Sequence, residues 1–224
     1  MKKILVINAS ARSSKSKSRE LTEVFIKQWK ITNGEAVFTF RDLAISEIPF
    51  VNESWIEASS KKKNQRNEHD NNILKISDLY IEEVKSADII VLGSPMYNWS
   101  IPGTLKAYLD QIIRVNETWK INTDDSKKPY SGLLEDKILF LFLTRGGTGY
   151  GKGEPNEHMN FQSTYLDVVF KLMGIHNIHT VRIDGVSLDT QKLVQNVENA
   201  HENIRNLIAN EVHKNTKQGH ESEQ

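Results

Sequence analysis

The stretch of sequence that decides the fold is Gly93-Ser94-Pro95-Met96-Tyr97-Asn98-Trp99-Ser100-Ile101-Pro102. It follows the apolar run 89–92, whose length and β-branched content predict a buried strand. It precedes residues 103–115, where apolar side chains recur at helical spacing, with Ser100 expected as the N-cap and Pro102 in the first turn. The stretch is therefore expected to form a loop at the carboxyl end of a strand, where open α/β sheets bind ligands.

The composition of this loop predicts one wall of a pocket for a planar ring. Met96, Tyr97 and Trp99 offer a flat and polarizable surface, and Asn98 adds a hydrogen-bond donor and an acceptor. An aromatic loop that only covers the edge of the sheet would use the same residue types. Both interpretations stay open when this loop is considered alone.

Length and charge narrow the class of protein. The chain has 224 residues, which predicts one domain with an insertion or a tail. Its 29 Lys and Arg balance 29 Asp and Glu, so a nucleic-acid partner is disfavoured. The chain contains no Cys, which excludes disulfides and thiol chemistry. No apolar run approaches the ~18 residues of a membrane span, and the apolar start is too short for a signal peptide. We therefore expect a cytoplasmic protein without a membrane partner.

Apolar runs and helical periodicities alternate along the chain. Strands are predicted at 3–8, 35–40, 89–92, 137–144 and 177–183, and helices from about 16–18, over 73–84, 103–115 and 155–173, and after a cap at Asp189. This alternation predicts a doubly wound, five-stranded parallel sheet with helices on both faces. One domain is expected over 1–213, with an irregular loop at 116–131. A polar insertion near 51–72 is a lid, an interface arm or a disordered segment, and 214–224 form a disordered tail.

A second group of candidate residues follows the first strand. Residues 9–19 are rich in hydroxyl groups and carry four cations and no carboxylate. Ser10, Ser16, Lys17 and Ser18 lie where the strand ends and a helix begins. Backbone N–H groups and the helix dipole favour an anion at such a place. We predict a phosphate site here, the alternative being a flexible, solvated Ser/Lys loop.

A third group follows the fourth strand in the glycine-rich segment that begins Thr144-Arg145-Gly146-Gly147. Glycines allow backbone N–H groups to approach a ligand closely; the alternative is a plain surface loop. Residues 146–152 fit the start of a P-loop, but Gly153 stands where that motif needs Ser or Thr. The dinucleotide motif G-x-G-x-x-G and the hydrolase motif G-x-S-x-G do not occur. No cluster of histidines and carboxylates indicates a metal.

Taken together, these three loops resemble those of the flavodoxin-like FMN-dependent NADH:quinone oxidoreductases, a family that includes the bacterial azoreductases. The resemblance extends over about residues 1–210. It rests on Pro95-Met96-Tyr97-Asn98-Trp99, on Thr144-Arg145-Gly146-Gly147, and on Ser10 with Ser16-Lys17-Ser18. Trp99 replaces the Phe that is usual in the family, and Lys17 replaces a Gln.

The resemblance implies a flavodoxin-like fold with bound FMN and with NADH or NADPH as co-substrate. Ser10 and residues 16–18 would hold the phosphate, residues 95–99 would cover one face of the ring, and residues 144–147 would hold its polar edge. The implied reaction is a ping-pong, two-electron hydride transfer to a quinone or azo compound. The flavin carries this chemistry, so no side chain is expected to be catalytic.

The family also implies a homodimer with the active site at the interface, and it places His158 near a pocket; a helix-start residue is the plainer interpretation of this histidine. Two other functions remain open. One is a flavodoxin-type electron carrier without its own NAD(P)H turnover. The other is an NAD(P)H:FMN reductase, for which FMN is a diffusible substrate.

Overall fold

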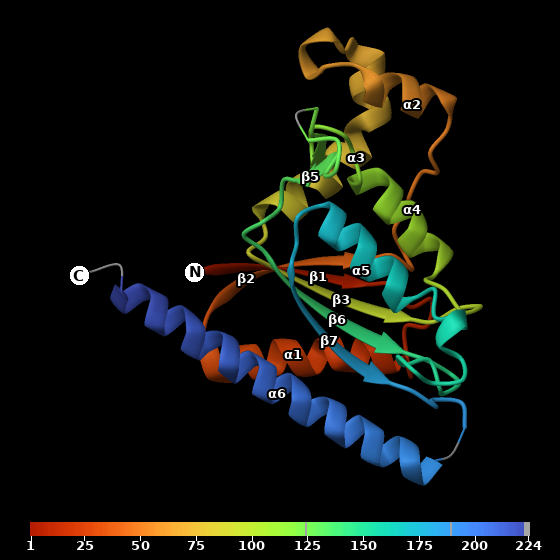
Figure 1. The fold of residues 1–224 in the computed structure, drawn as a ribbon, viewed down its shortest axis with the longest axis vertical. Helices are drawn as coiled ribbons and strands as arrows, with labels where there is room; N and C mark the ends of the chain where they lie inside the picture. Colours follow the sequence, from red (N-terminus) through yellow and green to blue (C-terminus); the bar gives the residue numbers. More distant parts are fainter. Residues whose placement is uncertain (124, 189, 222–224) are drawn as a thin grey trace.

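A five-stranded parallel sheet forms the centre of the protein in the computed structural model, which describes residues 1–123, 125–188 and 190–221. The strand order is β2-β1-β3-β6-β7 (Figure 1). The strands are β1 (Lys2–Asn8), β2 (Ala36–Asp42), β3 (Ile89–Pro95), β6 (Ile138–Thr144) and β7 (Asn177–Ile183). All five overlap predicted strands, although β3 continues to Pro95, three residues beyond the predicted end at 92, and their pairings are parallel. The predicted five-stranded parallel sheet is confirmed.

Helices cover both faces of the sheet. Figure 1 shows α3 (Glu68–Ser86), α4 (Gly103–Ile112) and α5 (Ser163–Leu172) on one side, and α1 (Lys17–Asn33) and α6 (Thr190–Glu221) on the other. Because neighbouring side chains of a strand point to opposite faces, the continuous apolar runs of the central strands supply two cores at once.

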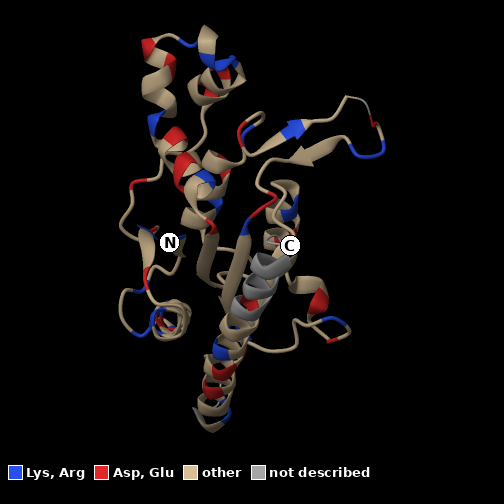
Figure 2. Cartoon of the chain, turned by 90° about the vertical axis from the view of Figure 1, so that its left-hand side faces the viewer, with Lys and Arg blue, Asp and Glu red and all other residues tan. Residues whose placement is uncertain are grey.

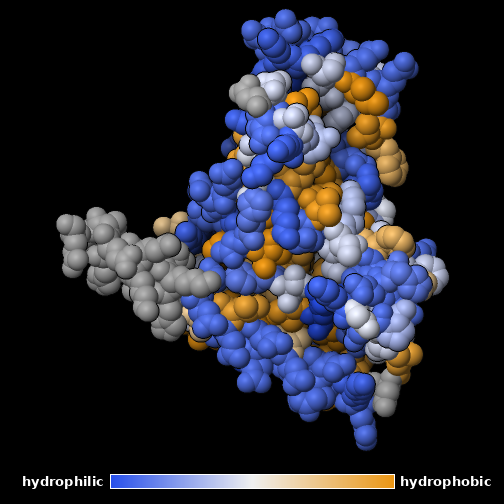
Figure 3. Space-filling model, viewed as in Figure 1, coloured by the Kyte–Doolittle hydropathy of each residue, from blue (hydrophilic) through white to orange (hydrophobic). Residues whose placement is uncertain are grey.

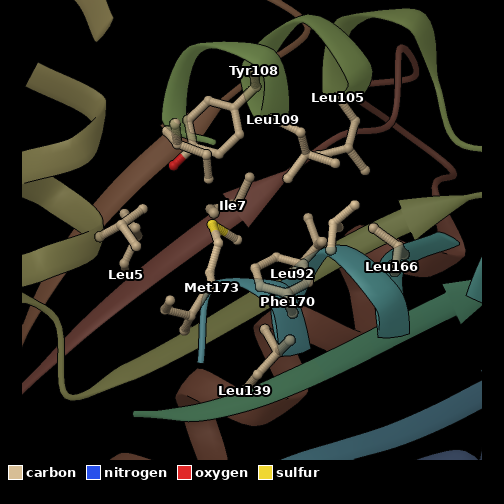
Figure 4. Close-up of a cluster of buried hydrophobic side chains, with 14 of the residues drawn as sticks. Leu5, Ile7, Leu92, Leu105, Tyr108, Leu109, Leu139, Leu166, Phe170 and Met173 are labelled. Carbon is tan, nitrogen blue, oxygen red and sulfur yellow. The ribbon is translucent and has the colours of Figure 1, made fainter. Parts of the chain in front are cut away.

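The two cores follow this alternation residue by residue. Leu5 and Leu139 pack with α4 and α5 side chains such as Tyr108 and Phe170 (Figure 4). The side chains one position earlier or later in the strands, such as Ile4, Val6 and Phe140, pack on the other face with Phe25 of α1 and Ile204 of α6. Burial of apolar surface on both faces fixes the register of the sheet.

The ends of the helices agree only in part with the sequence analysis. α1 begins after the N-cap Ser16, in agreement with the predicted start at 16–18, and it ends before Gly34, which has φ +73. The predicted N-cap of α4, Ser100, is wrong: Pro102 occupies that position, because Ser100 is held in a tight turn with Tyr97. The predicted cap of α6, Asp189, lies outside the described residues.

The predicted helix over 155–173 is interrupted at its start. A short 3-10 helix, η2 (Glu157–Met159), is followed by α5 only from Ser163 onward. The break has a visible cause. The Asn160 side chain accepts from the N–H of Ser163 (3.2 Å), and the N–H of Phe161 is shared between the carbonyls of Trp99 and Met159, each at 3.1 Å.

The two segments that appeared irregular in the sequence contain regular structure. The insertion near 51–72 forms α2 (Glu53–Ser60), the 3-10 helix η1 (Lys63–Gln65) and the first turn of α3, which begins after the N-cap Asn67. The loop at 116–131 contains an antiparallel pair, β4 (Trp119–Ile121) and β5 (Tyr130–Gly132). Strands of three residues are too short for a periodicity to reveal them.

α2 is attached to the domain by a small cluster of its own. Trp55 and Ala58 pack on Leu74 of α3. The indole N–H of Trp55 donates to Gln111 Oε1 of α4 (2.8 Å), and Gln111 Nε2 donates to the carbonyl of Pro49 (2.7 Å). This pair of bonds fixes both the entry and the first turn of the insertion.

The last helix extends into the segment that was expected to be a disordered tail. The backbone of α6 continues to Glu221, and residues 222–224 lie outside the described part of the chain. None of the helices described is both long enough and apolar enough to cross a membrane.

Gly93 lies where β3 approaches α1 closely, and a substitution there tests this contact. A Cβ at this position would lie 2.8 Å from the carbonyl oxygen of Ser18 and 2.8 Å from Cγ2 of Thr22. We expect Gly93→Ala to lower the free energy of unfolding by roughly 1–3 kcal/mol in urea titrations, because α1 must move. Gly103→Ala is the control, since a Cβ there meets no atom within 4 Å. Equal unfolding midpoints for the two variants would contradict the tight contact.

Candidate functional site

The carboxyl ends of β1, β3 and β6 bring three loops to one cavity. Parallel pairing places Asn8 beside Gly93 and Pro95 beside Thr144, so the segments that follow these strands start side by side. The cavity measures about 270 Å³. It is lined by Ser10, Arg12, Lys15, Ser16, Lys17, Pro95, Met96, Tyr97, Thr144, Gly146, Val186, Ser187 and Leu193. Residues from all three loops singled out in the sequence therefore lie together.

The first loop presents hydroxyl groups at the start of α1. Ser10 is buried, and its Oγ accepts from the N–H of Arg12 (3.2 Å). Ser16 caps α1, and its Oγ lies 3.3 Å from that of Ser18. Ser18 itself is buried and does not line the cavity. The first N–H groups of a helix lack partners within the helix and favour an anion.

Arg19 supports the backbone of the first loop and does not line the cavity. Arg19 forms a bidentate pair with Asp42, with both N–O distances 2.7 Å. The same guanidinium donates to the carbonyl oxygens of Ser10 and Arg12, each at 2.8 Å. The hydrogen bonds from Arg19 hold the pKa of the Asp42 carboxyl below its ordinary value of 3.8. Arg19 and Asp42 thus fix the backbone of the loop.

The remaining cations of the segment differ in availability. Lys17 lines the cavity, but its Nζ lies 2.7 Å from a carboxylate oxygen of Glu20. Arg12 and Lys15 also line the cavity, and neither forms an ion pair with a described residue. Sequence reasoning counted these two cations without naming them as site residues. Their position in a carboxylate-free segment at a strand end was the available signal.

The aromatic loop is a tight turn with an unusual backbone. Tyr97 and Ser100 exchange two backbone hydrogen bonds of 2.9 and 3.0 Å. Asn98 and Trp99 between them have φ +46 and +64, the pattern of a type I′ turn. A bulky residue in this region costs of order 1–3 kcal/mol and persists only where its surroundings hold it. Here the bond from the Phe161 N–H to the Trp99 carbonyl supplies part of that support.

The side chains of the aromatic loop divide between the cavity and its outer surface. Pro95, Met96 and Tyr97 line the cavity, and the Tyr97 hydroxyl accepts from the N–H of Ala11 (3.3 Å), which connects this loop to the first. Asn98 and Trp99 do not line it. Trp99 is 48% exposed.

In the third loop only Thr144 and Gly146 line the cavity. The N–H of Met96 donates to the Thr144 carbonyl (2.7 Å), which joins this loop to the aromatic one. Within the described part of the chain, no acceptor is found for the N–H groups of Gly146 and Gly147. Gly147 does not line the cavity; a Cβ there would lie 3.0 Å from Tyr150 Oη.

The Arg145 side chain, predicted as a site residue, turns away from the cavity into the protein. It is 1% exposed and donates to Gln162 Oε1 (3.1 Å), Asn160 Oδ1 (3.1 Å) and Ser163 Oγ (3.0 Å). Its Nη1 lies 3.7 Å from Asp184. Burial lowers the pKa of Arg145 and raises that of the Asp184 carboxyl. Arg145 therefore holds the loop in place.

Sequence reasoning missed the contribution of the segment after β7. The N–H of Ser187 donates to the Gly146 carbonyl (3.3 Å), and Val186, Ser187 and Leu193 line the cavity. These residues carry no motif. His158 is exposed in η2 and does not line the cavity. Among the described residues, no group of three or more His, Cys, Asp or Glu is placed to hold a metal.

Comparison with known proteins identifies relatives over almost the whole chain. A family described by its flavodoxin-like fold matches residues 2–208. The FMN-dependent NADH:quinone oxidoreductase 1 of Trichormus variabilis is 34% identical over 206 residues, covering 92% of this chain and 95% of the relative. That of Hahella chejuensis is 36% identical over 196 residues, covering 88% and 91%. The crystal structure of an azoreductase from Bacillus anthracis matches with a TM-score of 0.83 and 25% identity, covering 93% and 99%. These relatives confirm the resemblance drawn from the three loops.

Asp42→Asn tests whether the pair with Arg19 stabilises the first loop. At about pH 7 we expect the variant to lose roughly 1 kcal/mol of unfolding free energy. Because the pKa of Asp42 is depressed, its stabilisation is present above the unfolded-state pKa and disappears as pH falls through the folded-state pKa. The difference between variant and parent in urea titrations should therefore shrink between about pH 5 and pH 3.

The control for this experiment is Asp110→Asn, which removes an exposed i,i+4 pair with Lys106. It should change stability by at most about 0.5 kcal/mol. A difference between Asp42→Asn and the parent that stays constant as the pH is lowered would contradict the role assigned to this carboxylate.

Proposed function

The chain belongs to the family with the flavodoxin-like fold that matches residues 2–208, and from this membership we propose that it is an FMN-dependent NADH:quinone oxidoreductase that also reduces azo compounds. The observation that carries the proposal is the single cavity shared by the three loops. Its lining combines hydroxyl groups and cations of the first loop with residues of the aromatic turn. A phosphate joined to a planar ring fits this combination.

The residues present fit FMN at each part of the molecule. Its phosphate would be held by Ser10, Ser16 and Lys17 and the start of α1 at Ser18, with Arg12 supplying an additional charge that no described carboxylate neutralises. A phosphate carries close to two negative charges at neutral pH and is held well by hydroxyl groups, cations and a helix N-terminus. NADH, or NADPH in its place, would be the co-substrate.

The ring would lie against the aromatic turn. Pro95, Met96 and Tyr97 offer the apolar wall, with Asn98 and Trp99 at its outer margin. The backbone N–H groups of Gly146 and Gly147, together with Thr144 and the backbone of Arg145, would face the polar edge. An N–H group aimed at a ring oxygen stabilises negative charge there. Stabilising this negative charge is the main electrostatic role that we assign to the protein in the site.

When bound, FMN would supply the chemistry of hydride transfer between a nicotinamide and a quinone or azo acceptor, in the proposed ping-pong sequence. The protein would bind and orient the cofactor and exclude water from the ring. The hydrogen bond from Ala11 to the Tyr97 hydroxyl joins the first loop to the aromatic turn. No side chain is assigned as general acid or base.

The proposal includes a homodimer in the cytoplasm, with the acceptor site at the interface and without a nucleic-acid or membrane partner. Exposed apolar surface beside the cavity supports the dimer. Trp99 and Phe161 are 48% and 59% exposed and are joined by a backbone hydrogen bond. A second copy placed against this surface would cover both rings and close the open side of the ring site.

Turnover tests the function directly. We expect the purified protein, incubated with FMN and passed through a desalting column, to be yellow and to oxidise NADH when benzoquinone or methyl red is added. An electron carrier would bind FMN and leave NADH unconsumed. A reductase that uses diffusible FMN would lose its flavin on the column and need excess FMN for turnover. A preparation that stays colourless after incubation with FMN would exclude the proposal.

Trp99 separates the role of the ring from that of the strained backbone. Trp99→Gly and Trp99→Ala should both weaken FMN binding roughly tenfold, about 1.4 kcal/mol, because each removes the indole. Trp99→Gly should be about 1 kcal/mol more stable than Trp99→Ala, because only glycine adopts φ +64 without strain. Fluorescence titration of FMN and urea unfolding measure the two effects. An unchanged FMN affinity in both variants would remove Trp99 from the site.

A further inference from the structure

A second, larger cavity lies at the opposite end of α4. It measures about 840 Å³ and shares no residue with the first. Its lining comes from α2, η1 and the turn that follows α4, namely Trp55, Ile56, Ser59, Ser60, Lys61, Lys62, Lys63, Arg66, Ile113, Arg114, Val115, Asn116 and Glu117. α4 begins just after the aromatic turn and ends at this cavity, so the helix separates the two sites by roughly 15 Å of its own length.

The lining of this cavity, hereafter the basic cavity, is strongly positive. It contains five cations, Lys61, Lys62, Lys63, Arg66 and Arg114, against one carboxylate, Glu117. Figure 2 shows basic residues gathered at the turn between α2 and α3. The chain as a whole is neutral, so this excess is local.

Nearby carboxylates neutralise only part of this charge. Lys61 pairs with Asp70 at 2.7 Å. Arg114 lies 2.6 Å from Asp78, and Arg66 reaches the same carboxylate at 4.0 Å. Glu117 is paired with Lys85 at 2.6 Å, and its other carboxylate oxygen lies 3.8 Å from Arg114 Nη2. Lys62 and Lys63 are exposed and form no ion pair with any described residue. Net positive charge therefore remains around the basic cavity.

The two arginines are built into the wall with hydrogen-bonding groups unused. The side chains of Arg66 and Arg114 are only 5% and 3% exposed. Arg114 Nη1 donates to Ser77 and Asp78, but its Nε and Nη2, and Nε of Arg66, have no hydrogen-bond partner among the described residues. A buried N–H without a partner costs about 1–3 kcal/mol, and more where the group is charged. Both side chains line the basic cavity, so their charge would attract an anion that enters it.

Part of the lining is apolar. Trp55, Ile56, Ile113 and Val115 form this part, and the indole N–H of Trp55 is already used by Gln111. Figure 3 shows hydrophobic residues at the surface along α2 below the hydrophilic end of the molecule. The volume is that of sites for small molecules rather than of an extended surface for a macromolecule.

We propose that the basic cavity binds a small organic polyanion, with its negatively charged groups toward Lys62, Lys63, Arg66 and Arg114 and its apolar body against Trp55 and Ile113. The relevant chemistry is two or more negative charges on phosphate, sulfate or carboxylate groups, carried by a body of a few rings or a short chain. The partly unsatisfied guanidinium groups and the apolar part of the lining account for the two parts of such a ligand.

Two probes test the proposal on protein saturated with FMN, which fills the first cavity. Bis-ANS, an aromatic disulfonate, should bind with saturable fluorescence, and inorganic pyrophosphate should displace it and raise the melting temperature of the protein. Lys62→Glu with Lys63→Glu should weaken bis-ANS binding about tenfold or more, because two charges in the basic cavity change sign.

The matched control is Lys2→Glu with Lys27→Glu, which changes the net charge equally at exposed positions that do not line the cavity. It should leave the affinity within about twofold, since distant exposed charges are screened. Both double variants should retain the NADH oxidation of the parent, so a loss of binding cannot be a loss of folding. Equal weakening by the two double variants, or no displacement and no change in melting temperature with pyrophosphate, would overturn the proposal.

Discussion

The buried guanidinium of Arg145 is the interaction on which the arrangement of the first cavity depends. It leaves the end of β6 and contacts Gln162, Asn160 and Ser163 at the start of α5 and Asp184 after β7. Gln162 in turn donates to the carbonyl of Ser94 in β3 (3.1 Å). A buried charge is stable only if its partners stay in place, because their loss leaves it uncompensated. One cation thus ties together the ends of three strands.

The same division between supporting and available cations recurs in the first loop. The Arg19 guanidinium donates its hydrogen bonds to Asp42 and to backbone carbonyls, and Lys17 is paired with Glu20. Arg12 and Lys15 are left to face the cavity. A guanidinium suits the supporting task, because its planar donors can satisfy several oxygen atoms at once. Arg19 and Arg145 therefore support the loops, whereas Arg12 faces the cavity, and sequence composition alone does not separate supporting arginines from ligand-binding ones.

The sheet could be predicted because its strands are continuous apolar runs, and the position of the cavity followed because parallel strands end at one edge. The direction in which a side chain points could not be predicted in this way. Arg145 looked like a ligand, yet it satisfies buried groups of α5 that lie close only in the fold. Val186 and Leu193 reach the cavity from a segment without any motif. The helices of the insertion were hidden because their caps, Asn52 and Asn67, stand in a polar segment that has little apolar periodicity.

Net charge is a second example of what the sequence alone cannot predict. The equal numbers of cations and carboxylates disfavour a partner that contacts the whole surface, such as a nucleic acid. The equal totals do not predict the charge of a cavity, because the electrostatic potential inside a cavity is set mainly by the few charged residues that line it. Glu117 and Asp78 lie beside Arg114 but are shared with Lys85 and Arg66. A chain without net charge can therefore hold a strongly positive cavity, provided that the balancing carboxylates are placed elsewhere in the fold.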